Sequence, residues 1–272
     1  MLDFSISIWS GWAPGADSLA AEKPPGERPV NSISRDAKPD VSAVPPMLRR
    51  RLNQLGRACA SEVLLLLPDE EVPLVYCSQH GDIERTLAVL LELAGDGGVS
   101  PNNFSLAVHN AICGVLSIHT KSTAAITTIA AGTEGLIPVL LEAVGLLSTS
   151  CPKVQCVLCD VPLPDVYQSE DSFPAQPFAV SFVVTTEECA NSLMEDERTK
   201  PISLSLSPSE MAIDSRPAVS PLDFCEFLSA ESDLSVQLPH NSQLWELVKR
   251  APHAQNLSQR KSGLDKAMVS GD

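Results

Sequence analysis

Apolar residues alternate or cluster with strand periods at five places along the chain. Phe4–Trp9 alternates apolar and polar residues, which predicts a half-buried opening strand. Short apolar runs typical of strands buried in a sheet follow at Val72–Cys77, Ala124–Ile129, Val154–Val161 and Phe178–Thr185. Longer segments with a helical period separate these runs. This alternation predicts an α/β protein with a mixed sheet covered by helices.

Helical spacing of apolar residues marks the connecting segments. Leucines and other apolar residues three and four apart predict one helix from Leu48 to Leu66, opened by Pro45-Pro46. The same spacing predicts further helices over Asp82–Ala94, Asn103–Ile118, Pro221–Leu228 and Gln243–Arg250. It also predicts a very apolar helix that follows the turn after Ile129 and ends at about Leu147. In the third helix the expected apolar face consists of Phe104, Val108, Ile112, Val115 and Leu116.

Prolines and polar residues divide the rest of the chain. We expect a single domain over residues 1–250, with long irregular loops at 13–46 and 187–220, where only Ile202–Leu206 resembles a strand. Residues 251–272 have no apolar period and are expected to form a disordered tail.

The charge of the chain excludes several classes of partner. With 34 acidic and 19 basic residues the net charge is −15, which disfavours nucleic acid and anionic membranes. No apolar run is long enough to span a bilayer, and the N-terminus lacks the basic start of a signal peptide. The eight cysteines lie mainly in apolar segments, as reduced thiols do. We therefore expect a cytoplasmic protein.

Candidate metal and catalytic motifs are weak. Cys156 and Cys159 lie three apart in a predicted strand and should point to opposite faces, so with Cys151 they are interpreted as structural thiols. His80, Asp82 and Glu84 fit a strand-to-helix turn better than a metal site. Hydrolase elbows and phosphate-binding glycine loops are missing from the sequence, and we expect neither a metal nor another cofactor.

Residues 101–162 carry a more specific pattern. A helix with an Asn-x-x-x-Gly core, Asn110 to Gly114, precedes an apolar strand and then the turn Ala130-Ala131-Gly132-Thr133-Glu134-Gly135. The segments that accompany it are Trp12-Ala13-Pro14-Gly15, Arg49-Arg50-Arg51, Cys77-Ser78-Gln79-His80-Gly81-Asp82 and Leu158-Cys159-Asp160-Val161-Pro162.

Together these segments resemble the N-terminal half of β-ketoacyl synthases, the condensing enzymes of the thiolase fold. They are most similar to short synthase-like proteins of the chain-length-factor type, as found in aryl polyene biosynthesis. The resemblance implies a thiolase-like half fold. It places Ala130 at the position of the nucleophilic cysteine, and a methyl group cannot form a thioester. His240 and His253 lack the context of the family's catalytic histidines, and Cys113 lies in mid-helix.

The resemblance also implies a heterodimer with a catalytic β-ketoacyl-ACP synthase. The expected interface is the predicted strand, made of Ala124, Ala125, Ile126, Thr127, Thr128 and Ile129. The expected walls of the acyl-chain tunnel are Phe104, His109, Ile112 and Leu116. Arg49, Arg50 and Arg51 are candidates for contact with acyl carrier protein, or they lie over an acidic loop of the chain itself.

Two alternatives remain open at this stage. The chain can be a self-sufficient acyltransferase or decarboxylase that uses Cys113 or His109, or a scaffold that stabilises its partner without touching substrate. His109 alone, on a mostly apolar helix, also fits a hydrogen-bonded packing residue.

Overall fold

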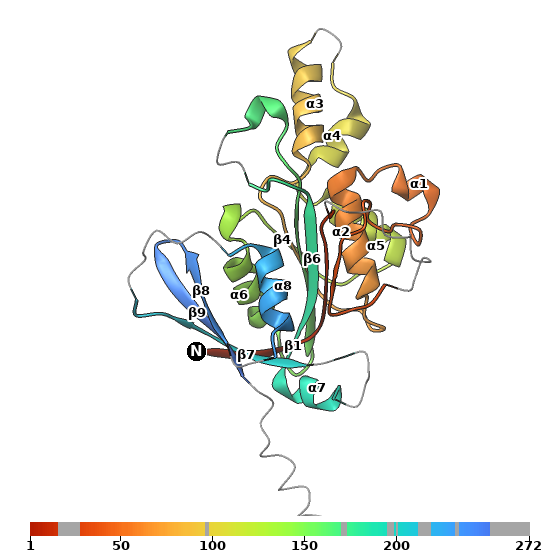
Figure 1. Ribbon diagram of the computed structural model, residues 1–272. Coiled ribbons are helices and arrows are strands. Elements are labelled where there is room, and N and C mark those ends of the chain that lie inside the picture. The colour runs from red at the N-terminus through yellow and green to blue at the C-terminus, as the bar shows by residue number, and fades with distance from the viewer. Residues whose placement is uncertain are drawn as a thin grey trace, which may run out of the picture.

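The computed structural model describes residues 1–15, 28–95, 98–169, 173–194, 199, 201–211, 219–231 and 234–250. In this part of the chain nine strands form one mixed sheet in the order β4-β3-β5-β6-β1-β7-β9-β8, with β2 paired to β1 (Figure 1). The strands are β1 (Leu2–Trp12), β2 (Ile33–Ser34), β3 (Leu74–Cys77), β4 (Ile126–Ile129), β5 (Lys153–Asp160), β6 (Phe178–Thr185), β7 (Ile202–Pro208), β8 (Ser235–His240) and β9 (Gln243–Arg250).

Helices cover both faces of this sheet. They are α1 (Pro46–Arg49), α2 (Gln54–Leu65), α3 (Ile83–Ala94), α4 (Pro101–Ala107), α5 (Ala111–Thr120), α6 (Leu136–Leu146), α7 (Glu187–Ser192) and α8 (Pro221–Ser229), with short 3₁₀ turns η1 (Gly132–Glu134) and η2 (Asp165–Tyr167). One apolar core lies under α6 and α8, and a second lies under α2 and α5. The predicted α/β half fold is confirmed.

The two cysteines of β5 confirm how the strand is oriented. Cys156 belongs to the core under α6 and α8, whereas Cys159 belongs to the core under α2 and α5. Side chains three apart on a strand point to opposite faces, as predicted. Burial raises the pKa of both thiols well above its ordinary value, which fits structural cysteines.

The opening strand is not half-buried. β1 lies inside the sheet, antiparallel to β6 on one side and to β7 on the other, and helices cover both of its faces. The polar positions that suggested a solvent face are serines: Ser5, Ser7 and Ser10 are all buried. Serine is small enough to be enclosed there, and the Ser7 hydroxyl donates to the Val183 carbonyl.

Two predicted helices are each divided into two shorter ones. The helix expected over Leu48–Leu66 is divided into α1 and α2, because the Asn53 side chain accepts a hydrogen bond from the Gly56 amide and starts a new helix. The helix expected over Asn103–Ile118 is divided into α4 and α5 by residues 108–110. Its predicted apolar face is divided too, since Phe104 and Val108 are exposed.

The predicted elements differ most from the structure in the C-terminal third of the chain. Gln243–Arg250 is strand β9 and not a helix, and it forms a hairpin with β8. The turn residues Asn241 and Ser242 both have positive φ, the conformation that tight hairpins require. Residues 187–220, expected to be mainly a loop, contain α7 as well as strand β7. The predicted disordered tail, 251–272, lies outside the described residues.

A buried ion pair attaches the end of the proline-rich segment to the sheet. The Arg28 guanidinium donates to both carboxylate oxygens of Glu62, at 2.8 and 3.1 Å, and to the Ser61 hydroxyl and the Gly11 carbonyl. Glu62 lies on α2 and is fully buried, and the Arg28 side chain is nearly so. The pair therefore connects three segments that are distant in sequence.

Candidate functional site

Strand β4 forms one edge of the sheet. It runs parallel to β3, and in the described part of the chain no strand pairs with its other side. The carbonyls of Ala125 and Ile129 accept hydrogen bonds from the amides of Leu74 and Ser78, so alternate residues face β3. The N–H and C=O groups of Ile126 and Thr128 consequently point outward. Parallel sheet edges are normally covered.

The turn after β4 contains no cysteine. Ala130 is exposed at the end of the strand, and Gly132, which begins η1, has φ of +62°. A nucleophile elbow places its reactive residue at such a strained strand-to-helix turn. By backbone geometry the tip of this turn is Gly132, whereas the sequence resemblance assigns Ala130. Neither residue has a reactive side chain.

The closest thiol to this turn was not singled out in the sequence. Cys77 ends β3, and its Sγ lies so near the start of α6 that a Cβ on Gly135 would approach it to 2.8 Å. Burial, with the neighbouring Asp160 carboxylate, raises the pKa of Cys77 to about 12. A thiol with this pKa is almost entirely protonated at neutral pH, which makes it a poor nucleophile. Its position became visible only through the close packing at Gly135.

Cys113 is equally unsuited to covalent chemistry. It lies within α5, is 1% exposed, and burial raises its pKa to about 12. His109 lies just before α5, where its Nε2 is 2.9 Å from the Ser78 carbonyl and its ring packs edge-on against Tyr76. This confirms the interpretation of His109 as a hydrogen-bonded packing residue.

A buried carboxylate organises the Ser78–Gly81 turn. Asp160, at the end of β5, accepts hydrogen bonds from the Ser78 hydroxyl at 2.7 Å and from the Gln79 amide. The Ser78 hydroxyl in turn accepts from the Gly81 amide. Asp160 is only 8% exposed, and desolvation raises its pKa from 3.8 to about 6, while these hydrogen bonds act in the opposite direction.

This shift predicts a pH dependence of stability. Since the pKa of Asp160 is higher in the folded chain, the folded state holds the proton more tightly, so this contribution is full below pH 4 and is lost as pH rises through about 6. Its size is on the order of 3 kcal/mol. Urea denaturation of Asp160→Asn and the unaltered chain should therefore give a difference that changes between pH 4 and 7. A pH-independent difference would contradict this assignment.

The predicted cluster of His80, Asp82 and Glu84 is a helix start. The Asp82 carboxylate accepts from the Arg85 amide and caps α3, and it also accepts from the Asn53 side chain at 2.8 Å. In the described residues no group of three or more His, Cys, Asp or Glu side chains is arranged to hold a metal ion. None of the helices described there is long and apolar enough to cross a membrane.

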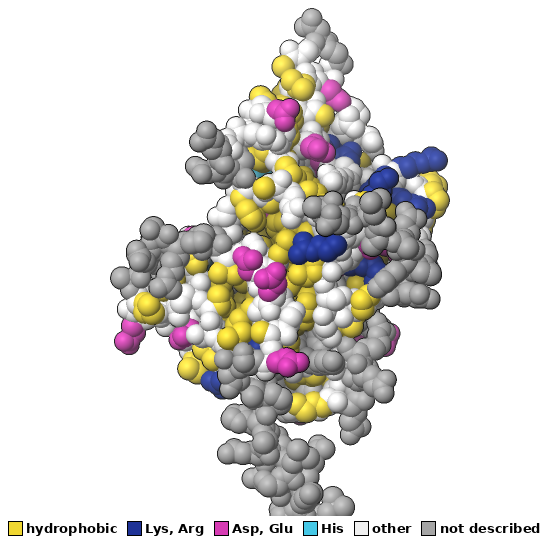
Figure 2. Space-filling view, in the orientation of Figure 1, with side chains coloured by type: hydrophobic (Ala, Val, Ile, Leu, Met, Phe, Trp, Pro, Cys, Tyr) yellow, Lys and Arg dark blue, Asp and Glu magenta, His cyan; other side chains and the backbone are white. Residues whose placement is uncertain are grey.

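Helices α3 and α4 form an arm that projects from the sheet (Figure 1). α3 is amphipathic, yet Val89 is its single buried residue. Large apolar side chains along the arm are exposed, and hydrophobic surface is visible there in Figure 2. They are Leu90, Leu91, Leu93, Phe104 and, just after α4, Val108.

The four tunnel candidates occupy different environments. Phe104 is 61% exposed on the arm, and His109 is half-buried near Ser78. Ile112 and Leu116 are buried residues of α5, with Ile112 close to Gly56 of α2. The structure therefore separates one exposed candidate from one half-buried and two buried ones.

The three candidate arginines lie on and after α1. Arg50 and Arg51 are exposed and Arg49 is partly so, and Figure 2 shows basic side chains gathered beside α1. The Arg51 carbonyl accepts a hydrogen bond from the Arg85 side chain. Among the ion pairs formed between described residues, none involves Arg49, Arg50 or Arg51.

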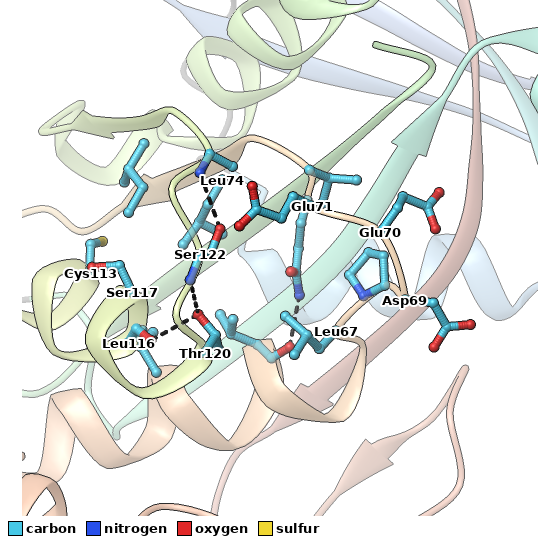
Figure 3. A pocket seen from close by; sticks show the side chains of 16 residues that line it. Leu67, Asp69, Glu70, Glu71, Leu74, Cys113, Leu116, Ser117, Thr120 and Ser122 are labelled. Atoms are coloured by element: carbon cyan, nitrogen blue, oxygen red, sulfur yellow. Dashed lines mark hydrogen bonds between the residues drawn. The ribbon is translucent and has the colours of Figure 1, made fainter. Parts of the chain in front are cut away.

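A cavity of about 170 Å³ opens beside the start of β4 (Figure 3). Apolar side chains from α2, β3, α5 and β4 form most of its wall: Val63, Leu67, Val72, Leu74, Leu116 and Ile126. Asp69, Glu70 and Glu71 lie along the loop that borders it. Glu70 pairs with Lys153, and Glu71 accepts from the amide and hydroxyl of Thr123, so two of these carboxylates already have partners in the chain.

Comparisons with known proteins agree with this geometry. A family model described as "Beta-ketoacyl synthase, N-terminal domain" matches residues 12–246. Among solved structures, the chain is similar to one titled as a ketosynthase (ApeO) in complex with its chain length factor (ApeC) from Xenorhabdus doucetiae. That match has 25% identity and a TM-score of 0.65, and it covers 91% of this chain and 100% of that one.

A second solved structure, the ishigamide ketosynthase/chain length factor, is similar in fold. It has 16% identity and a TM-score of 0.55, with 77% of this chain and 68% of that chain covered. The comparison with curated proteins gives no significant match.

Proposed function

Because this chain belongs to the β-ketoacyl synthase family, we propose that it is a non-catalytic, chain-length-factor-like partner of a β-ketoacyl-ACP synthase. The two chains form a heterodimer, and this one helps to shape the tunnel that holds the growing acyl chain. The setting is aryl polyene, polyketide or fatty-acid-type biosynthesis. The solved structure most relevant to this proposal is titled as a ketosynthase with its chain length factor.

The observation that carries the proposal is the uncovered edge of β4. Two residues there, Ile126 and Thr128, direct their backbone groups outward, and the strand leads directly into the turn at Ala130 and Gly132. A parallel sheet edge of this kind is stabilised when another chain covers it. The candidate interface residues Ala124 to Ile129 all belong to this edge or to the segment just before it.

The absence of a thiol at the turn supports a role without covalent chemistry. Ala130 and Gly132 offer no nucleophile, and Cys77 and Cys113 are buried thiols with pKa values raised to about 12. Decarboxylative condensation is therefore assigned to the partner. This chain contributes part of the wall of the acyl-chain tunnel and the interface with the ketosynthase.

The exposed arm of α3 and α4 is assigned to the wall of the acyl-chain tunnel. Phe104 presents a large apolar side chain to the outside of this chain, which is unfavourable in water and suits a wall completed by another subunit. His109, just before α5, and Ile112 and Leu116, on α5, are assigned as supporting wall residues. Arg49, Arg50 and Arg51 are assigned to contact with acyl carrier protein, as an exposed basic group on an otherwise acidic chain.

Replacing Phe104 with alanine tests the tunnel. Removing the ring is expected to shift the products of the heterodimer towards longer acyl chains, because the steric stop recedes. Met47→Ala, at an exposed apolar residue of α1, is the matched control. Product lengths are read by mass spectrometry of carrier-bound chains. Unchanged lengths in Phe104→Ala would favour a scaffold without substrate contact.

Co-expression with a full-length ketosynthase of the same organism tests the heterodimer. We expect a stoichiometric complex by size-exclusion chromatography with light scattering, and poor solubility of this chain alone. An electrophilic acyl label that reacts with cysteine thiols should modify the ketosynthase only. Labelling of Cys113 would instead support a self-sufficient acyltransferase, and product formation by this chain alone would support an independent enzyme.

A further inference from the structure

The edge of β4 is too small to hold two proteins together by itself. It is one strand of four residues, Ile126–Ile129, and two of these direct backbone groups outward. Stable interfaces use roughly 20–30 residues on each side and anchor a few large side chains in pockets. A partner that pairs with β4 must therefore contact neighbouring surfaces, and the cavity beside Ile126 is contiguous with the edge.

The register of the sheet directs a partner side chain towards this cavity. Ile126 pairs with Leu74 in β3, and both line the cavity, so the side chain of Ile126 lies on the face covered by α2 and α5. Directly paired residues on neighbouring strands point to the same face, with their Cβ atoms about 5 Å apart. A residue placed opposite Ile126 by a strand added to this edge therefore points to the same face as the cavity.

The size and lining of the cavity specify the chemistry of that residue. Its volume of about 170 Å³ is close to that of an engineered protein cavity of roughly 150 Å³ that binds benzene. Its wall is mainly apolar, while Glu70 and Glu71 on its border are already engaged with Lys153 and Thr123. Asp69 is exposed at the same border, which suits a basic residue next to the apolar anchor.

We infer that this cavity receives an aromatic or branched aliphatic side chain of the ketosynthase subunit that pairs with β4. The inference rests on the proposed heterodimer and adds to it a specific anchoring site, made of Leu67, Leu74, Ile126 and their neighbours. The site lies at the end of β4 opposite the turn at Gly132, so it is separate from that turn.

Filling the cavity from within tests the inference. Ser117 lines the cavity from the surface side of α5 and belongs to neither apolar core, so Ser117→Phe places a ring in the cavity with little disturbance of the fold. Ser192→Phe, at an exposed position of α7, is the matched control. Affinity for the co-purified ketosynthase is expected to fall at least about 30-fold in Ser117→Phe and less than about twofold in Ser192→Phe. Circular dichroism checks that each variant is folded, and Ser117→Leu replaces Ser117→Phe if the larger residue unfolds the chain.

The possible failures are distinguishable. If the unaltered pair does not associate, the heterodimer is contradicted and the inference falls with it. If the pair associates and folded Ser117→Phe binds as tightly as the control, the anchoring site alone is contradicted. The inference is also overturned if Ser117→Phe abolishes self-association of this chain while ketosynthase binding is unchanged, because a second copy of the chain then fills the cavity. It is likewise overturned if decanoate binds the isolated chain beside Ser117 and the bound decanoate leaves the affinity for the ketosynthase unchanged.

Discussion

Replacing Thr128 with proline is expected to weaken the heterodimer by about 100-fold or more. The N–H of Thr128 points away from β3, so proline removes a hydrogen bond to the partner and puts its ring where the partner strand would lie. A lost and unsatisfied backbone bond costs about 1–3 kcal/mol, and the steric conflict adds to it. Kd is measured by surface plasmon resonance against the ketosynthase.

The same substitution should leave the isolated chain folded, since edge strands tolerate proline where the N–H faces outward. Thr128→Val is the matched control, because it keeps the N–H and the β-branched shape while removing the hydroxyl. Its Kd should change less than about threefold. Equal binding by Thr128→Pro and Thr128→Val would mean that the edge is not used for strand pairing.

Replacing Arg28 with alanine is expected to destabilise the chain by about 3–5 kcal/mol. The substitution leaves the Glu62 carboxylate fully buried without its two guanidinium hydrogen bonds, and an uncompensated buried charge is strongly unfavourable. It also releases residue 28 from the Gly11 carbonyl. The free energy of unfolding is measured by urea denaturation.

Glu70→Gln provides the comparison for Arg28→Ala. Glu70 forms an ion pair with Lys153 at the surface, where Glu70 is 52% exposed, and such pairs contribute less than about 1 kcal/mol. A loss below 1 kcal/mol in Arg28→Ala would show that the Arg28–Glu62 pair does not hold these segments together.

Strand and helix periods predicted most of the central fold. β3, β5, β6 and α8 lie where apolar patterning placed them, because each buries a continuous apolar face. α3 also lies where its apolar spacing placed it, although Val89 is its single buried residue. The errors have physical causes. Buried serines imitated a solvent face in β1. The cap at Asn53 and the non-helical residues 108–110 divided two helices, and the leucines and valine of β9 have a spacing that suits either a helix or a strand.

The site was less accessible to sequence reasoning than the fold. The edge strand and the turn without a cysteine follow from contiguous residues, so the sequence was sufficient to propose them. The cavity beside Ile126 is assembled from α2, the following loop, α5 and β4, which only the folded chain brings together. The proximity of Cys77 to the turn depends on Gly135, whose role is visible only in the packing.

Hydrogen exchange of the β4 amides tests the central claim most directly. In the isolated chain the amides of Ile126 and Thr128 face outward and should exchange rapidly, whereas the amide of Thr127, which faces β3, should be protected. Adding the ketosynthase should slow exchange at Ile126 and Thr128 by about 100-fold or more, the factor that corresponds to about 2.7 kcal/mol. Rapid exchange at both positions within a stable complex would contradict the claim that the partner covers this edge.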